Sequence, residues 1–132
     1  MLPKLPRILN KKEADWTTTV FRGWCEKKGI TAVFEIKYTK KDYIAFSEVK
    51  DHQKQSLLKV RHGVFVYKIP DMGEKSPFDL FSFNKAPAYI VIKYPRGVAI
   101  IPIDTFLLEE KRSKRKSLTW ERAKELSTID FK

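Results

Sequence analysis

The chain has 132 residues, enough for one domain with a single core. Hydrophobic residues make up 42% of it, which is a globular composition, and its apolar runs are far shorter than the ~20 residues of a membrane span. The N-terminus lacks the apolar stretch of a secretory signal. The single cysteine, Cys25, excludes an internal disulfide framework and a cysteine-rich zinc site. We therefore expect a soluble, cytoplasmic protein with no membrane association.

The charge is the first functional indication. Twenty-seven Lys and Arg against 16 Asp and Glu give a net charge of +11. Such an excess concentrates polyanions near the surface, and nucleic acid is the commonest polyanion. The alternatives are a merely soluble basic protein or one with an acidic protein partner. The charge favours nucleic acid.

The N-terminal third predicts an extended arm and a helix. Residues 1–10 contain two prolines, which oppose a helix there. Asn10 and Glu13 have the spacing of a capping box, so we expect a helix from Asn10 to about Trp24 that ends at Gly29. Its apolar stripe would contain Trp16, Val20, Phe21 and Trp24.

A strand and a second helix follow. Residues 31–39 alternate, so that Glu35 and Lys37 share a polar face and the opposite face is apolar. Ser47, with Glu48 in the first turn, predicts a helix that runs to about Arg61 before Gly63.

The remaining sequence is typical of strands. Four β-rich stretches, separated by turn signals, cover residues 64–69, 78–83, 88–94 and 98–106. A final helix over residues 119–126 is capped by Ser117 or Thr119. We therefore expect an α/β fold, bordering on α+β, with a mixed central sheet of about five strands flanked by helices.

Glu35 and Lys37 are the central candidates for chemistry. A carboxylate can hold Mg²⁺, and a neighbouring ammonium can orient water or offset charge on a scissile phosphate. A structural salt bridge is the alternative. Glu-x-Lys occurs four times in the chain. Only the pair at 35 and 37 lies inside a strand with an apolar opposite face, so its context selects it.

Gln53 is the second candidate. It lies in the middle of an otherwise apolar helix stripe, where a buried amide needs partners. Either it caps backbone, or it reaches the acidic strand. His52 beside it is interpreted as a boundary residue, because no other metal ligands cluster nearby.

Asp79 is the third candidate, with Lys68 and Asp71 as possible additions. Asp79 begins a strand, and we predict that it is a metal ligand with Glu35, because a divalent ion needs at least two converging carboxylates. Lys68 shares a strand face with apolar residues. Asp71 follows Pro70 and precedes Gly73, so a turn is its alternative role.

These residues together resemble a known family. The resemblance is to the PD-(D/E)xK (restriction-endonuclease-like) nucleases, near the phage and archaeal-virus Holliday junction resolvases, and it runs from about Glu13 to Ala123. It is carried by an ordered set of motifs: Phe34-Glu-Ile-Lys37, Phe46-Ser, His52-Gln53, Lys68-Ile-Pro-Asp71, Pro77-Phe-Asp79, Ala88-Tyr-Ile-Val-Ile92 and Ser117-Leu-Thr-Trp-Glu-Arg-Ala123.

The resemblance implies a Mg²⁺-dependent homodimer that cleaves branched DNA, with Mn²⁺ as a substitute metal. It gives Glu35 and Lys37 the catalytic Glu-x-Lys role, Gln53 that of the helix glutamine, and Glu13 that of the acidic residue of the first helix. The usual aspartate precedes the Glu-x-Lys strand, whereas Asp79 comes 44 positions after Glu35. The site would be assembled in a rearranged order. Alternatively, residues 88–93 supply the strand of the site and Lys93 its lysine.

We expect a basic DNA-binding surface without sequence specificity, since phosphate contacts position a protein on DNA without recognising particular bases. Exposed aromatic side chains for base stacking are not evident, which favours duplex or branched DNA over single strands. A non-catalytic DNA-binding protein and a module for an acidic protein remain alternatives. The candidate phosphate contacts are Lys11, Lys12, Lys27, Lys28, Lys40, Lys41, Lys54, Lys59, Arg61, Lys111, Arg112, Lys114, Arg115 and Lys116.

Overall fold

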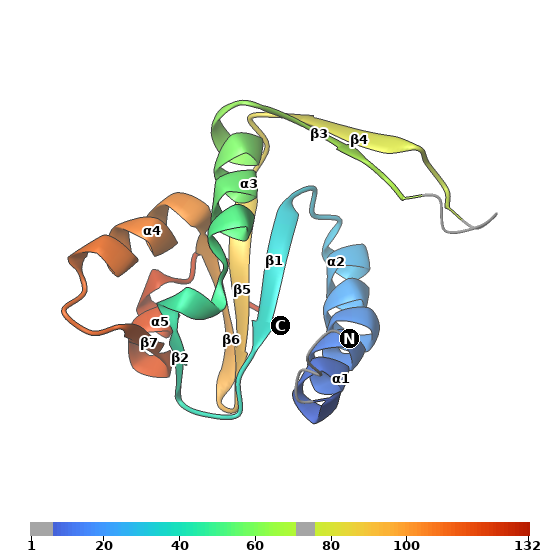
Figure 1. Cartoon of the computed structure of the whole chain (residues 1–132). Coiled ribbons are helices and arrows are strands. Elements are labelled where there is room, and N and C mark those ends of the chain that lie inside the picture. The colour runs from blue at the N-terminus through green and yellow to red at the C-terminus, as the bar shows by residue number, and fades with distance from the viewer. Residues whose placement is uncertain (1–6, 71–75) are drawn as a thin grey trace.

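The computed structural model describes residues 7–70 and 76–132, with side chains from Lys12 onward. Its centre is a three-stranded mixed sheet in the order β1-β5-β6 (Figure 1). Strand β1, Val33–Tyr38, runs parallel to β5, Ala88–Tyr94. Strand β6, Gly97–Pro102, returns antiparallel to β5 after a tight turn. The apolar, β-branched character of β5 fits its central, doubly covered position.

One face of this sheet is covered by the N-terminal helical region. Helix α1, Arg7–Trp16, continues through a π-helical segment, Thr17–Phe21, into α2, Arg22–Lys28. Gly29 ends α2 in the left-handed conformation, with φ of 67°, which a glycine adopts without steric cost. The stop at Gly29 was predicted correctly.

The other face is covered by two helices. Helix α3, Asp51–His62, follows a short 3-10 turn, Phe46–Glu48, and helix α4, Ile103–Arg112, follows β6 directly. Figure 1 shows α3 in front of the sheet, with α4 beside it. Each helix turns an apolar stripe inward and leaves most of its charged residues outside, with the exception of the buried Lys54 of α3.

The sheet therefore separates two apolar clusters. The larger one lies on the α3 and α4 side and includes Leu57, Ile90, Ile92, Ile101 and Phe106. The second lies on the α1 and α2 side and consists of Phe21, Trp24, Val91 and Ile100, with Ile129 and Phe131 of the C-terminal segment packed against them.

Two small sheets complete the fold. Strands β2, Tyr43–Ala45, and β7, Ser117–Thr119, pair antiparallel, and helix α5, Trp120–Leu126, follows β7 at once. Strands β3, Val64–Lys68, and β4, Leu80–Asn84, form a hairpin. Figure 1 shows this hairpin leaving the end of α3 and projecting away from the central sheet.

The two edges of the central sheet differ. The Ile100 amide donates to Ser127 Oγ, and the Thr128 amide donates to the Ile100 carbonyl, so the chain after α5 closes the outer edge of β6. Among the residues that the structure describes, strand β1 has a strand neighbour on one side only. Its outer edge keeps the hydrogen-bonding groups of an edge strand.

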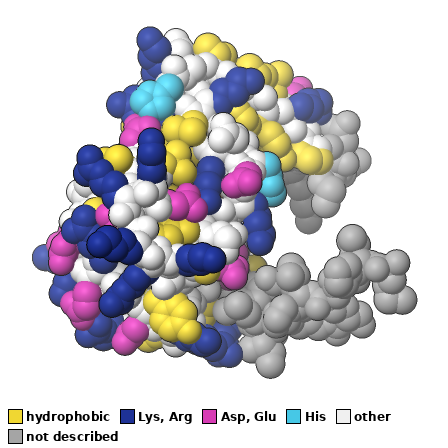
Figure 2. All heavy atoms as spheres, turned by 60° about the vertical axis from the view of Figure 1, so that its left-hand side comes forward, with side chains coloured by type: hydrophobic (Ala, Val, Ile, Leu, Met, Phe, Trp, Pro, Cys, Tyr) yellow, Lys and Arg dark blue, Asp and Glu magenta, His cyan; other side chains and the backbone are white. Residues whose placement is uncertain are grey.

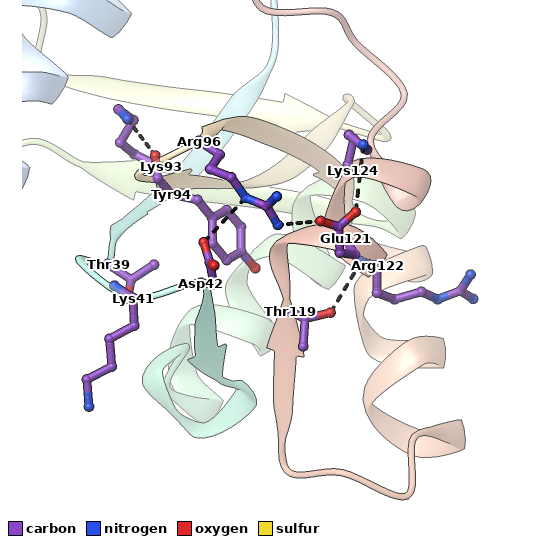
Figure 3. A network of polar contacts seen from close by, with 10 residues as sticks. All are labelled: Thr39, Lys41, Asp42, Lys93, Tyr94, Arg96, Thr119, Glu121, Arg122 and Lys124. Atoms are coloured by element: carbon purple, nitrogen blue, oxygen red, sulfur yellow. Dashed lines mark hydrogen bonds and ion pairs between the residues drawn. The ribbon is translucent and has the colours of Figure 1, made fainter.

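A polar network fastens the turn between β5 and β6 to the rest of the fold (Figure 3). The Arg96 guanidinium contacts the carboxylates of Asp42, at 3.5 Å, and Glu121. The Trp120 amide donates to the Asp42 carbonyl at 2.7 Å. The network thus joins the loop after β1, the turn after β5 and the start of α5.

Several predicted elements are confirmed within a few residues: the strands at β1, β3, β4 and β5, helix α3, and helix α5. Thr119 caps α5, since its Oγ1 accepts a hydrogen bond from the Arg122 amide at 3.3 Å. The expected capping box at Asn10 is wrong, because the helix already includes Arg7. The predicted extended arm over residues 1–10 is wrong for residues 7–10, which belong to α1, and its residues 1–6 lie outside the described part of the chain.

Other expectations need correction. The stretch 98–106 is not one strand, because β6 ends at Pro102 and α4 begins at Ile103, with Asp104 in its first turn. Strands β2 and β7 were not foreseen, since three-residue strands have too little periodicity to detect. The mixed α/β class is confirmed, but the largest sheet has three strands instead of about five. Val20, placed in the apolar stripe, is 44% exposed.

No helix among residues 7–70 and 76–132 combines the length and the apolar character that crossing a membrane requires.

Candidate functional site: a carboxylate cluster at the edge of β1

Glu35 and Lys37 lie on the face of β1 that points toward α3. They pair in register with Ile90 and Ile92, which belong to the larger core, whereas Phe34 pairs with Tyr89 on the other face. The side chains are 26% and 16% exposed, and Lys37 Nζ lies 3.6 Å from Glu35 Oε1. This is an ion pair on the rim of the core, where water screens it only in part.

Glu13 reaches the same edge from α1. Its Oε2 accepts a hydrogen bond from the Tyr38 amide at 3.2 Å, so it occupies one outward-facing donor of the edge strand. Burial raises the pKa of Glu13 above its usual value, and the charges of Glu35 and Glu48 raise it further. The Lys37 ammonium and the Tyr38 hydrogen bond act in the opposite direction and lower this pKa.

Glu48 was not identified from the sequence. It ends the short turn between β2 and α3, and its charge acts on Glu13. A long-range charge effect between this turn and the first helix leaves no local pattern in the sequence. We call Glu13, Glu35, Lys37 and Glu48 the carboxylate cluster. Within the described part of the chain, no three His, Cys, Asp or Glu side chains lie close enough together to hold one metal ion.

Gln53 takes the first of its two predicted alternatives. Its side-chain oxygen accepts a hydrogen bond from the Lys50 amide at 2.9 Å, three residues back, at the N-terminus of α3. This is one half of a capping box, and it satisfies a backbone donor that the helix leaves unpaired. The side-chain oxygen of Gln53 therefore caps the N-terminus of α3, and its hydrogen bond is to the Lys50 amide instead of to the acidic strand.

Asp79 does not join Glu35 within one chain. It lies just before β4, where its carbonyl accepts from the Ile69 amide at 2.8 Å, close to Lys68. This is the far end of the hairpin, which points away from the central sheet (Figure 1). The predicted Glu35–Asp79 metal site is therefore not assembled in a single copy. Asp71 lies outside the described residues.

The alternative site around Lys93 is also not formed. Lys93 pairs with Tyr38 and shares the face of Val91, opposite to Glu35. Its Nζ donates to the Tyr94 carbonyl. His52 is exposed on α3, as the prediction of a boundary residue requires.

The basic candidates divide into exposed and buried side chains. Lys54 is buried on α3, and its Nζ lies 3.0 Å from Glu110 Oε2 of α4, so its assignment as a phosphate contact is wrong. Figure 2 shows Lys and Arg side chains spread over one face, with Asp and Glu between them. The side chain of Lys11 is not described. The exposed candidates are Lys12, Lys27, Lys28, Lys40, Lys41, Lys59, Arg61, Lys111, Arg112, Lys114, Arg115 and Lys116.

The expectation of few exposed aromatic side chains is wrong. Tyr43, Tyr67, Phe78 and Phe81 are 43 to 59% exposed. Tyr67 and Phe81 belong to the β3–β4 hairpin, and Phe78 lies two residues before β4. The sequence pattern identified strands correctly, but it could not show that β3 and β4 form a two-stranded ribbon with little to cover it.

In comparisons with known proteins, no family model, no curated protein and no solved structure matches the chain.

Proposed function

We propose that this protein is a Mg²⁺-dependent endonuclease that hydrolyses DNA phosphodiester bonds. One observation carries the proposal: Glu35 and Lys37 form an ion pair on β1, and Glu13 of α1 accepts a hydrogen bond from the Tyr38 amide beside them, on a chain with a net charge of +11. Clustered carboxylates around one ammonium are the groups that phosphodiester hydrolysis uses. The exposed lysines and arginines supply the attraction for the DNA backbone.

Each member of the cluster has a role in this proposal. Glu35 is the carboxylate that would hold the cation, and Lys37, 3.6 Å away, would neutralise charge on the attacked phosphate. Glu13 is proposed for proton transfer, because burial raises its pKa above the ordinary carboxylate value. Glu48 adds negative potential that attracts a cation.

The fit to Mg²⁺ is partial within one copy. Mg²⁺ keeps several of its waters and takes only one or two protein carboxylates together with substrate phosphates. Glu35 meets that requirement as a first ligand, whereas no three-ligand group exists among the residues that the structure describes. A bound divalent cation would supply Lewis-acid polarisation of the phosphate and a more acidic water.

Branched DNA is the substrate that we propose, in line with the resemblance to the resolvases. The exposed basic residues lie on several elements instead of in one groove, as a surface that follows the backbones of more than one duplex arm would require.

A second candidate is a DNA-binding protein without catalytic activity. The Glu35–Lys37 ion pair favours it, since two groups that neutralise each other need no further chemical role. The lack of a three-ligand group among residues 7–70 and 76–132 is consistent with it as well.

A cleavage assay separates the two candidates. Labelled four-way junction, nicked duplex, linear duplex and single strand are incubated with the protein, with Mg²⁺, with Mn²⁺ and without metal. We expect metal-dependent nicking of the junction, and we expect Glu35→Gln to abolish it while binding in a gel-shift assay persists. Removal of a preorganised charge-stabilising group costs about 10²–10³ in rate, so Lys37→Met should slow nicking by that factor.

The matched control is Glu26→Gln. Glu26 belongs to another Glu-x-Lys tripeptide, but it is exposed on α2 and forms an ion pair with Arg22 of the same helix. We expect this variant to cleave like the wild type. Binding without nicking in any metal would establish the second candidate, and equal nicking by Glu35→Gln would remove Glu35 from the site.

A further inference from the structure

One face of the β3–β4 hairpin is aromatic. Residues that pair directly across an antiparallel ladder share a face, and the register pairs Phe65 with Phe83 and Tyr67 with Phe81. All four residues that the two strands place on this side are therefore Phe or Tyr, and we call them the aromatic face. The residues between them point to the opposite side of the hairpin.

The rings of the aromatic face are fixed at the base of the hairpin and exposed farther out. Phe65 and Phe83 pack against the larger core, whereas Tyr67 and Phe81 are 49 and 43% exposed. Along each strand the two rings are nearly parallel, with angles between their planes of 9° in β3 and 22° in β4. The anchored inner rings orient the outer rings before any ligand binds, which lowers the cost of binding.

The spacing of the rings suits a stack of nucleotide bases. Ring centroids lie 6.4 Å apart along β3 and 5.8 Å apart along β4. Successive nucleotides of a stacked strand lie about 3.4 Å apart, so the rings recur at roughly every second base. Every base has a flat π-face, and rings of this kind bind a single strand with little regard to its sequence. Bases in a duplex are already stacked on each other, so the aromatic face favours unpaired ones.

Positive charge lies beside the base of the hairpin. Arg61, in the last turn of α3, and Lys85, directly after β4, are both exposed. Both line a surface hollow of about 450 Å³. Asp104 also lines this hollow, and its Oδ1 lies 2.7 Å from His62 Nε2. Aromatic rings next to cations, on a chain of net charge +11, are the combination with which proteins bind single-stranded nucleic acid.

A lipid surface and an apolar protein partner fit the hairpin less well. The sequence between β3 and β4 includes Asp71, Glu74 and Lys75, and charged side chains are costly inside a bilayer. An apolar protein interface accepts aliphatic and aromatic side chains alike. Among residues 64–68 and 80–84, however, the rings all lie on one face and the aliphatic side chains on the other. Stacking on bases requires this separation.

We propose that the aromatic face is a binding site for single-stranded nucleic acid, on which unpaired bases stack while Arg61 and Lys85 contact the phosphates. The site is separate from the carboxylate cluster and requires no metal ion. It therefore goes beyond the proposed nuclease function and does not rest on it.

Fluorescence anisotropy in EDTA tests the stacking, with labelled dT and rU 20-mers and an abasic 20-mer that keeps the sugars and phosphates. Loss of one stacked base weakens binding by about 5- to 150-fold, so Phe81→Ala and Tyr67→Ala should each weaken binding of dT and rU by a factor in this range. Binding of the abasic strand should be weaker than that of dT and should change little in these variants. Phe81→Leu keeps an apolar side chain without a ring and should bind as weakly as Phe81→Ala.

Leu80→Ala is the matched control. Leu80 precedes Phe81 in β4 and is 50% exposed on the opposite face, so its variant should bind dT like the wild type. Circular dichroism confirms that each variant is folded.

Salt dependence separates stacking from phosphate contact. Each phosphate contact that is lost from a single strand lowers the slope of log K against log salt by about 0.7. Lys85→Asn removes a charge, and asparagine tolerates the left-handed backbone of this residue, whose φ is 53°. This variant should lower the slope by about 0.7, whereas Phe81→Ala should lower the affinity and leave the slope unchanged.

Several results would overturn the proposal. Equal affinity of the wild type for dT and the abasic strand would do so, as would a Phe81→Ala variant that binds dT normally. An equal loss in Leu80→Ala would show that the aromatic face has no special role. Sedimentation with phosphatidylserine vesicles and light scattering test the rival partners. If Phe81→Ala abolishes vesicle binding or self-association but not dT binding, the face belongs to lipid or to a second copy. A wild type that binds dT but cuts no DNA would leave this site standing and overturn the nuclease function.

Discussion

Glu35 and Lys37 lie mostly buried on the rim of a core, whereas Glu26 and Lys28 repeat the same tripeptide on the exposed surface of α2. Strand alternation in the sequence was enough to make this distinction, because the face of a β-strand follows from residue parity. Lys54 shows the limit of such reasoning. From the sequence alone, a lysine on a helix is assigned to the surface. Only the structure shows that Lys54 is buried against α4, where it pairs with Glu110.

Glu13 predicts a pH dependence of stability. Because burial raises its pKa, the native state holds this proton more tightly than the unfolded chain does. The stability that it contributes is complete below pH 4.5, its ordinary value, and is lost as the pH rises through the raised native pKa. Glu13→Gln keeps an acceptor for the Tyr38 amide and removes the charge.

Urea unfolding of the wild type and Glu13→Gln over a pH series measures this effect. We expect the variant to gain stability relative to the wild type as the pH rises above 4.5. A constant difference at all pH values would show that the native carboxylate is not desolvated.

The Lys54–Glu110 pair predicts asymmetric effects of mutation. Glu110→Ala leaves a buried ammonium without its partner, and we expect a loss of about 2 kcal/mol in the free energy of unfolding, below the full value for a buried pair because Glu110 is 33% exposed. Lys54→Met removes the charge and keeps the apolar stem, so its cost should stay under about 1 kcal/mol. Equal losses in urea unfolding would contradict this account.

At the scale of elements, the long and strongly periodic segments could be predicted and the short or composite ones could not. Strand β5 and helix α3 have clear patterns. The stretch 98–106 combines the end of β6 with the first turn of α4, and both are apolar because both face the core. Pro102 followed by Asp104 was the available signal, since a proline near a helix start and an acidic first turn are typical of an N-terminus.

Two glycines predict opposite effects of the same substitution. A Cβ on Gly97 would lie 2.5 Å from the Trp120 ring, at the turn that joins β5 and β6 to α5, so Gly97→Ala should lower stability by about 1–3 kcal/mol. A Cβ on Gly23 meets nothing within 4 Å on α2, so Gly23→Ala should raise stability by about 0.5–1 kcal/mol through helix propensity.

Thermal melting compares the two variants directly, because the substitution is the same. A lower melting temperature for Gly97→Ala and a higher one for Gly23→Ala are expected. An unchanged melting temperature for Gly97→Ala would show that Trp120 moves aside at little cost.

At the scale of the whole molecule, the net charge of +11 is the property that the sequence gives most directly, whereas its distribution required the structure. The basic residues are shared among several elements and interleaved with acidic ones (Figure 2). Glu13 was named from the family resemblance, whereas the charge effect of Glu48 on it was beyond the sequence, because that effect depends on how α1 lies against β1.

The loop between α4 and β7 predicts a change in salt dependence. Each phosphate contact that is lost lowers the slope of log K against log salt by about 0.9. Alanine at Lys114, Arg115 and Lys116, all exposed, should therefore reduce the slope of DNA binding by up to about 2.7. As a control, Lys54→Met removes one positive charge from a buried position and should leave the slope unchanged. Fluorescence anisotropy across a salt series gives both slopes.

The π-helical segment Thr17–Phe21 has a consequence for how the length of this chain can vary. Thr17 and Thr19 donate to the carbonyls four residues before them, which competes with ordinary helical bonds. The wider turn brings Phe21 beside Trp16, with ring centroids 5.6 Å apart, and leaves Val20 outside. This segment therefore contains one residue more than an α-helical segment joining the same two ends would need. A homologue shorter by one residue here would keep both aromatic side chains on the sheet, so an alignment gap at this point would be neutral for the fold.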